Sequence, residues 1–227
     1  MTDPLLLIHG FTDTRATWAP LLPHLAGDHE LLVPTLVGHR GGPPLPAGMT
    51  DPLATMADGL ERVLDEAGHE RVHVVGNSLG GWLAFMLAAR GRARTVVALS
   101  PGHGWPEDAP PSATARQFRL ANRMAPIGAR YVRGIVTRPG LRKLAFRDVI
   151  AHPERVPPAT AAELILGAAD CPIFRPYFDQ IESGNYRSEF GDLGVPVRIA
   201  WGTRDRTLPI RKTSAWFRDA LPDAEWV

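Results

Sequence analysis

The 227 residues predict one α/β domain with a mainly parallel, doubly wound sheet and an inserted helical cap. Two observations lead to this fold class. Short apolar runs rich in Val, Leu and Ile alternate with stretches long enough to form helices, and parallel strands require such crossovers. Residues 102–194, in contrast, contain no comparable run. A connection of that length in a compact domain indicates an insertion with its own secondary structure.

Five apolar runs are the expected strands of this sheet. Their apolar residues follow one another continuously instead of alternating with polar ones, which indicates strands buried on both faces. The runs occupy residues 4–10, 30–36, 71–77, 94–100 and 195–201. The stretches 15–26, 52–67 and 79–91 are the expected helices between them.

The segment 102–194 is expected to be a helical cap, and residues 1–101 and 195–227 the α/β core. Within the cap, helices are expected near residues 112–124, 138–151 and 159–169. Proline fits poorly inside a helix, so the nine prolines from Pro110 to Pro176 are expected to divide the cap into short helices.

Composition and charge argue against several classes of partner. A formal charge of +1 gives the chain no overall attraction for nucleic acid, so no nucleic-acid partner is expected. No segment reaches the roughly 18 apolar residues of a membrane span, and the short run 5–8 lacks the features of a signal peptide. The single cysteine, Cys171, cannot form an intrachain disulfide. Together these features favour a cytoplasmic protein.

One serine stands where a strand is expected to turn into a helix. The stretch GNSLG, residues 76–80, follows the apolar run and opens a helix-like segment. Its glycines allow a sharp, strained turn that would raise the Ser78 hydroxyl above the carboxyl edge of the sheet. Ser78 is therefore the predicted nucleophile, and a serine that merely caps the helix is the alternative. The backbone N–H of Leu79, in the first helical turn, is a predicted oxyanion donor.

A second glycine turn follows the first expected strand. In the stretch HGF, residues 9–11, the glycine would let the chain turn and bring the Phe11 N–H to the same edge of the sheet. With this turn, VGHRGG at 37–42 and GNSLG, the chain resembles the α/β-hydrolase superfamily. The resemblance spans roughly residues 4–101 and 195–227, and it implies the α/β-hydrolase fold.

The same resemblance implies roles for individual residues. Ser78 would be the nucleophile, and the N–H groups of Phe11 and Leu79 would form the oxyanion hole. A serine at this turn differs from the haloalkane dehalogenase and epoxide hydrolase branches, which place an aspartate there. After the run 195–201, the turn from Gly202 to Asp205 resembles the place where the family keeps its triad carboxylate. Asp205 is the predicted acid, and a helix cap is its alternative role.

The histidine that such a triad needs is not evident in the sequence. In the family the histidine follows the acid, whereas all eight histidines here precede Asp205. Residues 223–227 read as the start of another strand, so the catalytic histidine is expected beyond Val227. His103 is the alternative base and His9 is expected to be structural. The eight are His9, His24, His29, His39, His69, His73, His103 and His152.

The cap would supply most of the substrate pocket. From Glu107 to Ile150, nine basic residues accompany three acids, and the spacing of Arg116, Arg119 and Arg123 puts them on one helical face. Such a face suits a carboxylate-bearing or CoA-linked substrate or an acidic partner, and a solvated face is the plainer alternative. The candidates for the pocket wall, or for the cap's own core, are Phe118, Met124, Ile127, Phe146, Ile173, Phe174, Tyr177 and Phe178.

The favoured function is a cofactor-free serine hydrolase that acts on a carboxylic ester or thioester through an acyl-enzyme. Its partner would be a small-molecule carbonyl substrate, with an anionic group as one option. No metal is expected, and the glycine-rich motifs of nucleotide loops are missing. The alternatives are a C–C bond hydrolase or lyase of the same fold and a ligand-binding protein that lacks the histidine. The oligomeric state is left open.

Overall fold

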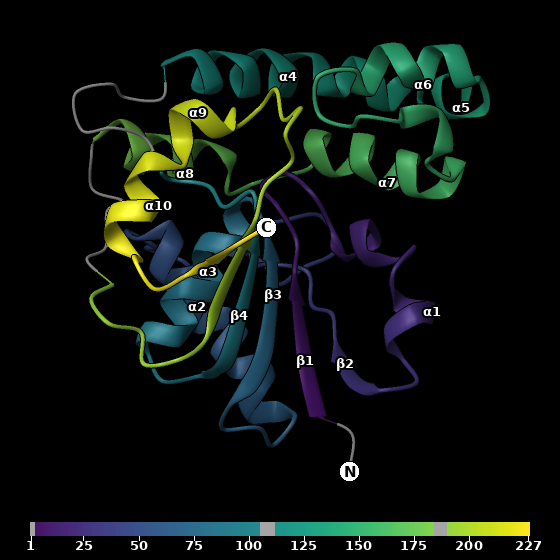
Figure 1. The fold of residues 1–227 in the computed structure, drawn as a ribbon. Coiled ribbons are helices and arrows are strands. Elements are labelled where there is room, and N and C mark those ends of the chain that lie inside the picture. The colour runs from purple at the N-terminus through teal and green to yellow at the C-terminus, as the bar shows by residue number, and fades with distance from the viewer. Residues whose placement is uncertain (1–2, 105–111, 184–189) are drawn as a thin grey trace.

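The computed structural model contains one sheet of six parallel strands with helices packed around it (Figure 1). It describes residues 3–104, 112–183 and 190–227. The sheet confirms the predicted fold class. In sheet order the strands are β2 (His29–Leu32), β1 (Asp3–Ile8), β3 (Val72–Asn77), β4 (Ala93–Leu99), β5 (Val197–Ala200) and β6 (Glu225–Trp226).

Each of the five predicted runs overlaps a strand, and the stretch 223–227 supplies the sixth. The order of the strands reverses between β1 and β3, because β2 lies on one side of β1 and β3 on the other. The loops that follow β1 and β3 therefore leave the same edge of the sheet next to each other. In open parallel sheets a ligand binds at such a reversal, beyond the carboxyl ends of the strands.

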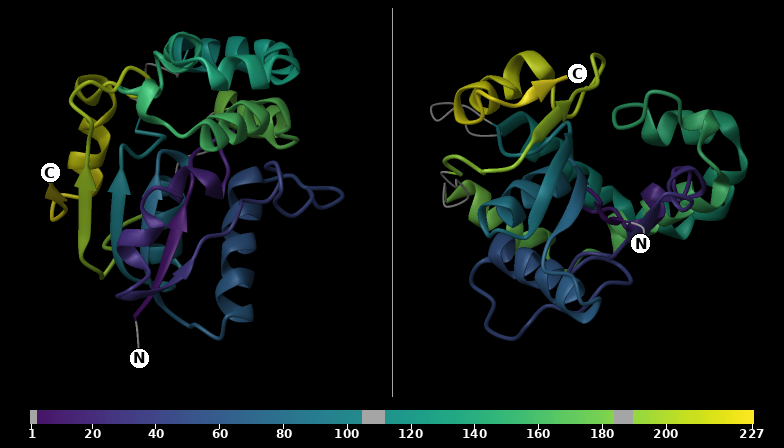
Figure 2. Two further views of the ribbon diagram at one scale, coloured as in Figure 1. Left: turned by 90° about the vertical axis from the view of Figure 1, so that its right-hand side faces the viewer. Right: turned by 60° about the horizontal axis from the view of Figure 1, so that its bottom comes forward.

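Alternate residues of each strand face two different packing layers. One face, with Leu6 and Ile8 of β1, packs against α2 (Pro52–Glu66) and α3 (Leu79–Ala89). The helix α2 begins at a proline, directly after Asp51, whose side chain accepts a hydrogen bond from the N–H of Ala54. Figure 2 shows this layer from two further directions.

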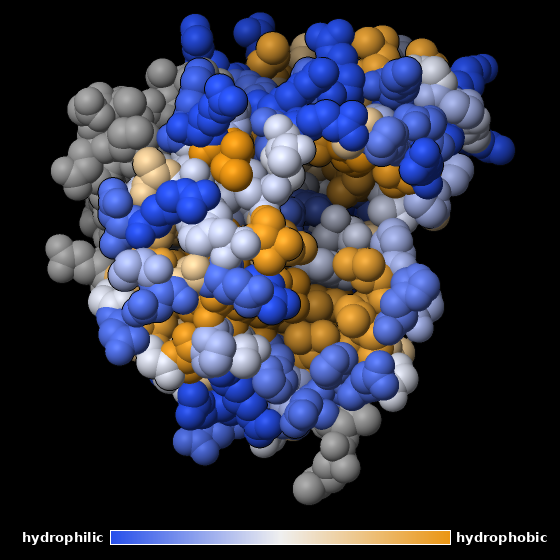
Figure 3. All heavy atoms as spheres, in the orientation of Figure 1, coloured by the Kyte–Doolittle hydropathy of each residue, from blue (hydrophilic) through white to orange (hydrophobic). Residues whose placement is uncertain are grey.

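The opposite face of the sheet is covered by less structure. Leu5 and Leu7 pack there with Trp18, at the end of the short helix η1 (Arg15–Trp18), and with residues of α1 (Leu22–Leu25). Farther along this face, Val75, Val97 and Leu99 are only half-buried. Hydrophobic surface is visible on this side of the sheet in Figure 3.

Between β4 and β5 the described chain is helical, and these helices lie over the carboxyl ends of the strands (Figure 1). We call α4 to α8 the inserted helices. They have a small core of their own, with Val136, Phe146, Ala161 and Ile165 at its centre. Their bounds are α4 (Ser112–Arg130), α5 (Val132–Thr137), α6 (Pro139–Phe146), η2 (Pro153–Arg155), α7 (Pro158–Ala169) and α8 (Phe174–Glu182). Two short helices, α9 (Ile210–Thr213) and α10 (Ala215–Ala220), connect β5 to β6.

Contrary to the prediction from the sequence, not all prolines of the inserted helices separate one helix from the next. Pro139 and Pro158 begin helices as expected, but Pro126 lies inside α4 and Pro176 inside α8. Pro126 has no N–H to donate to the carbonyl four residues earlier, so one bond of the α4 ladder is missing. The helix continues because its other face is packed, with Ala125 buried and Gly128 close to Ile165 of α7.

Candidate active site

Ser78 occupies a strained turn between β3 and α3. Its backbone angles are φ 54° and ψ −116°, a region that residues with a side chain rarely adopt. The turn is fixed from several sides: the N–H of Ser78 donates to the carbonyl of Leu99, 2.9 Å away, and the Ser78 carbonyl accepts from Gly81 and Gly102. Such strain persists only where surrounding contacts enforce it, and it is concentrated at functional sites.

The two flanking glycines are required by close packing. A Cβ at Gly76 would lie 2.1 Å from the carbonyl oxygen of Gly80, and a Cβ at Gly80 would lie 2.2 Å from that of Ile8. No side chain fits at either position without movement of the backbone. The motif therefore brings the first turn of α3 directly against the end of β1.

The turn after β1 lies beside Ser78. A Cβ at Gly10 would lie 3.5 Å from the Ser78 Cβ. His9 supports this turn: its Nε2 accepts from the N–H of Leu36 at 3.0 Å, so its Nδ1 donates to the carbonyl of Gly10 at 2.8 Å. Burial, aided by the neighbouring His39, lowers the pKa of His9 to about 3. A neutral, doubly bonded His9 agrees with the structural role expected for it.

The two predicted oxyanion donors have no competing partner. Among the described residues, neither the N–H of Phe11 nor that of Leu79 donates a hydrogen bond. Both residues line the same small cavity as Ser78. Two unengaged N–H groups beside one hydroxyl are an arrangement that can stabilise a developing oxyanion.

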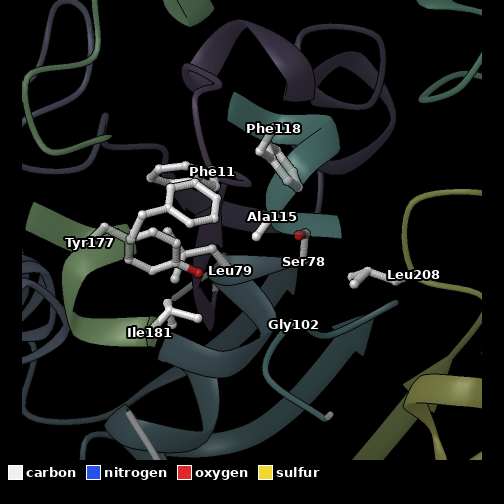
Figure 4. Close-up of a pocket in the computed structure, with 10 residues that line it drawn as sticks. Phe11, Ser78, Leu79, Gly102, Ala115, Phe118, Tyr177, Ile181 and Leu208 are labelled. Atoms are coloured by element: carbon white, nitrogen blue, oxygen red, sulfur yellow. The ribbon is translucent and has the colours of Figure 1, made fainter. Parts of the chain in front are cut away.

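The cavity above Ser78 is narrow and apolar. In Figure 4, Ser78 lies beneath Ala115 and Phe118 of α4, with Phe11 and Tyr177 on one side and Leu208 on the other. Its volume is about 20 Å³, which is room for about one water molecule. An ester can enter only if part of this wall moves. The described lining residues are Phe11, Ser78, Leu79, Gly102, Ala115, Phe118, Tyr177, Phe178, Ile181 and Leu208, none of them charged.

His103 lies behind this wall, not in it. Its Nε2 is 2.8 Å from the hydroxyl oxygen of Tyr177, and its ring packs on Trp82. The side chain is fully buried, and burial lowers the pKa of His103 to about 3. A group held this firmly in the neutral form, and engaged with Tyr177, is poorly suited to accept a proton from Ser78.

None of the eight histidines, all within the described residues, lines the cavity. Burial lowers the pKa of His39 to about 4, and this residue packs between His9 and Phe11. His73 bonds with Thr95 inside the sheet. His69 and His152 pair with nearby glutamates at the surface, and His24 and His29 lie outside the site.

Asp205 lies in the loop between β5 and α9. Its Oδ1 accepts hydrogen bonds from the N–H groups of Thr207 and Leu208, at 2.9 and 2.8 Å. These bonds direct the loop so that Leu208 reaches the cavity. Among the described residues, Oδ2 of Asp205 has no hydrogen-bond donor. The bonds to Oδ1 fix a turn that precedes α9, whose N-cap is Pro209, so Asp205 does not cap that helix, and one of its carboxylate oxygens is left available for another role.

The expected wall residues of the cap divide into four groups. Phe118, Tyr177 and Phe178 line the cavity, whereas Ile173 and Phe174 belong to the main core. Phe146 packs in the small core of the inserted helices, and Met124 and Ile127 are exposed. Ala115 and Ile181 were missed, because nothing in their local sequence distinguishes them from other helix residues.

Comparisons with known proteins show the family to which the chain belongs. The family model of the alpha/beta hydrolase fold matches residues 3–227, and the chain belongs to that family. The chain is 36% identical, over 172 residues, to the epoxide hydrolase EphH of Mycobacterium tuberculosis. That alignment covers 74% of this chain and 79% of the relative.

A second relative has a different named function. Over 224 residues the chain is 30% identical to the dihydrolipoyllysine-residue acetyltransferase component of an acetoin cleaving system from Cupriavidus necator. This alignment covers 94% of the chain and 54% of the relative, so the chain spans about half the length of that protein.

Among solved structures, the 2-hydroxy-6-oxo-6-phenylhexa-2,4-dienoate hydrolase from Rhodococcus sp. strain RHA1 superposes with a TM-score of 0.72. It is 21% identical, with 100% of this chain and 82% of that one covered, and it shows that the two chains share a fold. The named functions of the relatives are mostly hydrolytic, so a hydrolytic enzyme is the coarse function that they support.

Proposed function

We propose that the protein is a serine hydrolase that cleaves carboxylic esters or thioesters through an acyl-enzyme. The observation that carries the proposal is the strained Ser78 beside two backbone N–H groups without a partner. The Ser78 oxygen would attack the substrate carbonyl, and the N–H groups of Phe11 and Leu79 would hold the resulting oxyanion. Loss of the alcohol or thiol would leave an ester on Ser78, which water would then hydrolyse.

A serine nucleophile favours this reaction over epoxide opening. If Ser78 opened an epoxide, the product would be an ether, which has no carbonyl carbon for water to attack. The enzyme would stop after one turnover. An epoxide hydrolase that works through a covalent intermediate therefore needs a carboxylate at this position. For this reason the name of the Mycobacterium tuberculosis relative is not carried over to this chain.

The cavity favours an uncharged acyl group over an anionic one. No described lining residue carries a charge, and Phe11, Phe118 and Phe178 are among the residues that form the wall. Burying a carboxylate there without a partner would be costly. This argues against the anionic option, and against the C–C cleavage of substrates that carry a carboxylate into the pocket.

The mechanism also requires a group that accepts the proton of Ser78. Because β6 is parallel to β5, any residue that followed Val227 would leave the sheet at the same edge as Ser78 and Asp205. A histidine beyond Val227, oriented by Oδ2 of Asp205, stays our prediction for the base. A binding protein without a base is the alternative.

The experiment is intact-protein mass spectrometry of the native gene product with and without a fluorophosphonate probe. We expect one adduct on the wild type and none on Ser78→Ala. Ser100→Ala is the matched control, because Ser100 follows β4 at the same edge of the sheet, and it should label normally. A wild type that forms no adduct and hydrolyses no p-nitrophenyl ester would refute the proposal and point to ligand binding.

A further inference from the structure

Exposed hydrophobic side chains are concentrated on the inserted helices. Nine large hydrophobic residues of the described chain are well exposed, and seven of them lie between residues 120 and 149. Single exposed hydrophobic residues are normal on a protein surface, but a concentration of this kind marks an interaction site. The seven are Leu120, Met124, Ile127, Tyr131, Leu141, Leu144 and Val149.

Four of these residues form a stripe along α4 and its end. Leu120, Met124, Ile127 and Tyr131 are spaced by four, three and four residues, which places them on one side of a helix. They are 63%, 50%, 53% and 59% exposed. The opposite side of α4, with Ala115 and Ala125, is the buried one. The stripe therefore faces away from the rest of the molecule.

The same region carries a large net excess of positive charge. Residues 112–150 contain nine basic residues and one acid, Asp148, and have a formal charge of +8. Because the whole chain has a charge of +1, the remaining residues carry −7. Only Arg142 of the nine is buried. The molecule is thus strongly polarised, although its total charge is close to zero.

The positive charges border the stripe. Helical spacing places Arg116, Arg123 and Arg130 along one side of it. Within the described part of the chain, Arg123, Arg130, Arg133 and Lys143 form no ion pair. Hydrophilic and hydrophobic residues are interspersed along the upper margin of the molecule in Figure 3, where α4 to α6 lie.

We propose that the outer face of α4 to α6 docks on an anionic lipid membrane. Exposed hydrophobic residues flanked by arginines are the composition of helices that lie in the membrane interface. Anionic lipids attract the basic residues, and the acidic remainder of the chain orients the molecule with this face toward them. A second copy fits less well, because two such faces would bring their arginines together. This inference does not depend on the catalytic chemistry.

The first test is sedimentation of the whole protein with vesicles. We expect binding to vesicles of phosphatidylglycerol and phosphatidylcholine, little binding to phosphatidylcholine alone, and release as the salt concentration rises. Ile127→Ser and Arg123→Glu should each weaken binding about tenfold. The matched controls are Leu21→Ser and Arg15→Glu, exposed residues outside the inserted helices, and they should bind as the wild type does.

A second measurement reports where the protein touches the lipid. The only native thiol, Cys171, is buried, and burial raises its pKa to about 12, so it should react poorly with a dye. An environment-sensitive fluorophore on Ile127→Cys should become brighter and blue-shifted with anionic vesicles. The same dye on Leu21→Cys should not respond.

Three results would overturn the inference. Binding to no anionic vesicle at low salt would exclude a membrane role for this face. Equal loss of binding in Ile127→Ser and Leu21→Ser would place the contact elsewhere. A lipid-free dimer that disappears in Ile127→Ser would assign the face to a second copy of the chain instead.

Discussion

Gly80 shows how a single missing side chain supports the geometry of the site. A Cβ there would collide with the carbonyl oxygens of Ile8 and His9, at 2.2 and 2.7 Å. Gly80→Ala is expected to lower the free energy of unfolding by about 3 kcal/mol, because the backbone atoms it meets cannot move aside easily. Urea denaturation measures this change.

Gly140 provides the control for this substitution. It lies in α6 with open space around its Cα, so Gly140→Ala should stabilise the protein slightly, by less than about 1 kcal/mol. Similar effects at both positions would mean that close packing at the strained turn around Ser78 is not what requires glycine.

Asp205 combines a structural role with a predicted catalytic one, and two substitutions separate them. Asn keeps the oxygen that accepts from Thr207 and Leu208, so Asp205→Asn should leave the unfolding midpoint unchanged. If Asp205 orients the base, turnover of an ester should fall by roughly 10⁴-fold in the same variant. Asp205→Ala should additionally lose about 1 kcal/mol of stability. Normal turnover in Asp205→Asn would leave only the structural role.

At the scale of secondary structure, the sequence was most informative where a local pattern determines the element. Continuous apolar runs located β1, β3, β4 and β5, because strands buried on both faces need such runs. The glycines around Ser78 located the strained turn between β3 and α3, because the close packing there leaves no room for larger residues. The length of α4 was predicted poorly, because packing of Ala125 and Gly128 retains the helix beyond Pro126. The helix α8 was not predicted at all.

Pro126 leads to a prediction about the movement of α4 relative to Ser78. The residues of this helix that face the cavity, Ala115 and Phe118, lie before the proline. Because the missing hydrogen bond lets the two halves of α4 tilt separately, the first half can move away from Ser78. Pro126→Ala should restore the bond and stabilise the protein by about 1 kcal/mol or more.

The kinetic effect of that change should be greater for large substrates. Hydrolysis of a bulky p-nitrophenyl ester by Pro126→Ala should slow several-fold, since its entry requires the wall to move. Hydrolysis of p-nitrophenyl acetate should slow less, because its small acyl group requires a smaller movement of the wall. Equal rates for both esters in the variant and the wild type would show that α4 does not control entry.

At the scale of the whole molecule, three buried histidines should make the protein sensitive to acid. Burial lowers the pKa of His9 and His103 to about 3 and that of His39 to about 4. In the unfolded chain these groups take up protons below about pH 6.5. Each therefore reduces the free energy of unfolding by up to about 1.4 kcal/mol per pH unit as the pH falls below that value.

Asp13 opposes this trend. Burial raises the pKa of its carboxyl to about 6, so the folded state keeps a proton that the unfolded state releases from about pH 4 upward. The contribution of Asp13 to the free energy of unfolding thus increases as the pH falls from about 6 to 4. This gain offsets the loss caused by about one of the three histidines.

The urea concentration at the unfolding midpoint should therefore decrease overall between pH 7.5 and 5. His39→Gln should make the dependence shallower.

The wall of the cavity could not be predicted, because it is assembled from distant parts of the chain. Phe11, Ala115, Tyr177 and Leu208 meet there only after the inserted helices fold over the sheet. A residue such as Ala115 has no signature in the sequence, since its importance depends on which side of α4 faces Ser78. Composition also concealed the polarised charge, because a total of +1 averages two regions of opposite sign.

The cavity is built from two parts of the molecule, with a consequence for how its substrate range can change over evolution. Ser78 and the N–H groups of Phe11 and Leu79 belong to the ends of neighbouring strands and the start of a buried helix. Ala115, Phe118 and Tyr177 belong to the inserted helices. If Ser78 is the nucleophile that we propose, substitutions in α4 and α8 should alter which acyl group is accepted while the reactivity of Ser78 toward a small phosphonate is retained. Selection could then act on substrate range and chemistry separately.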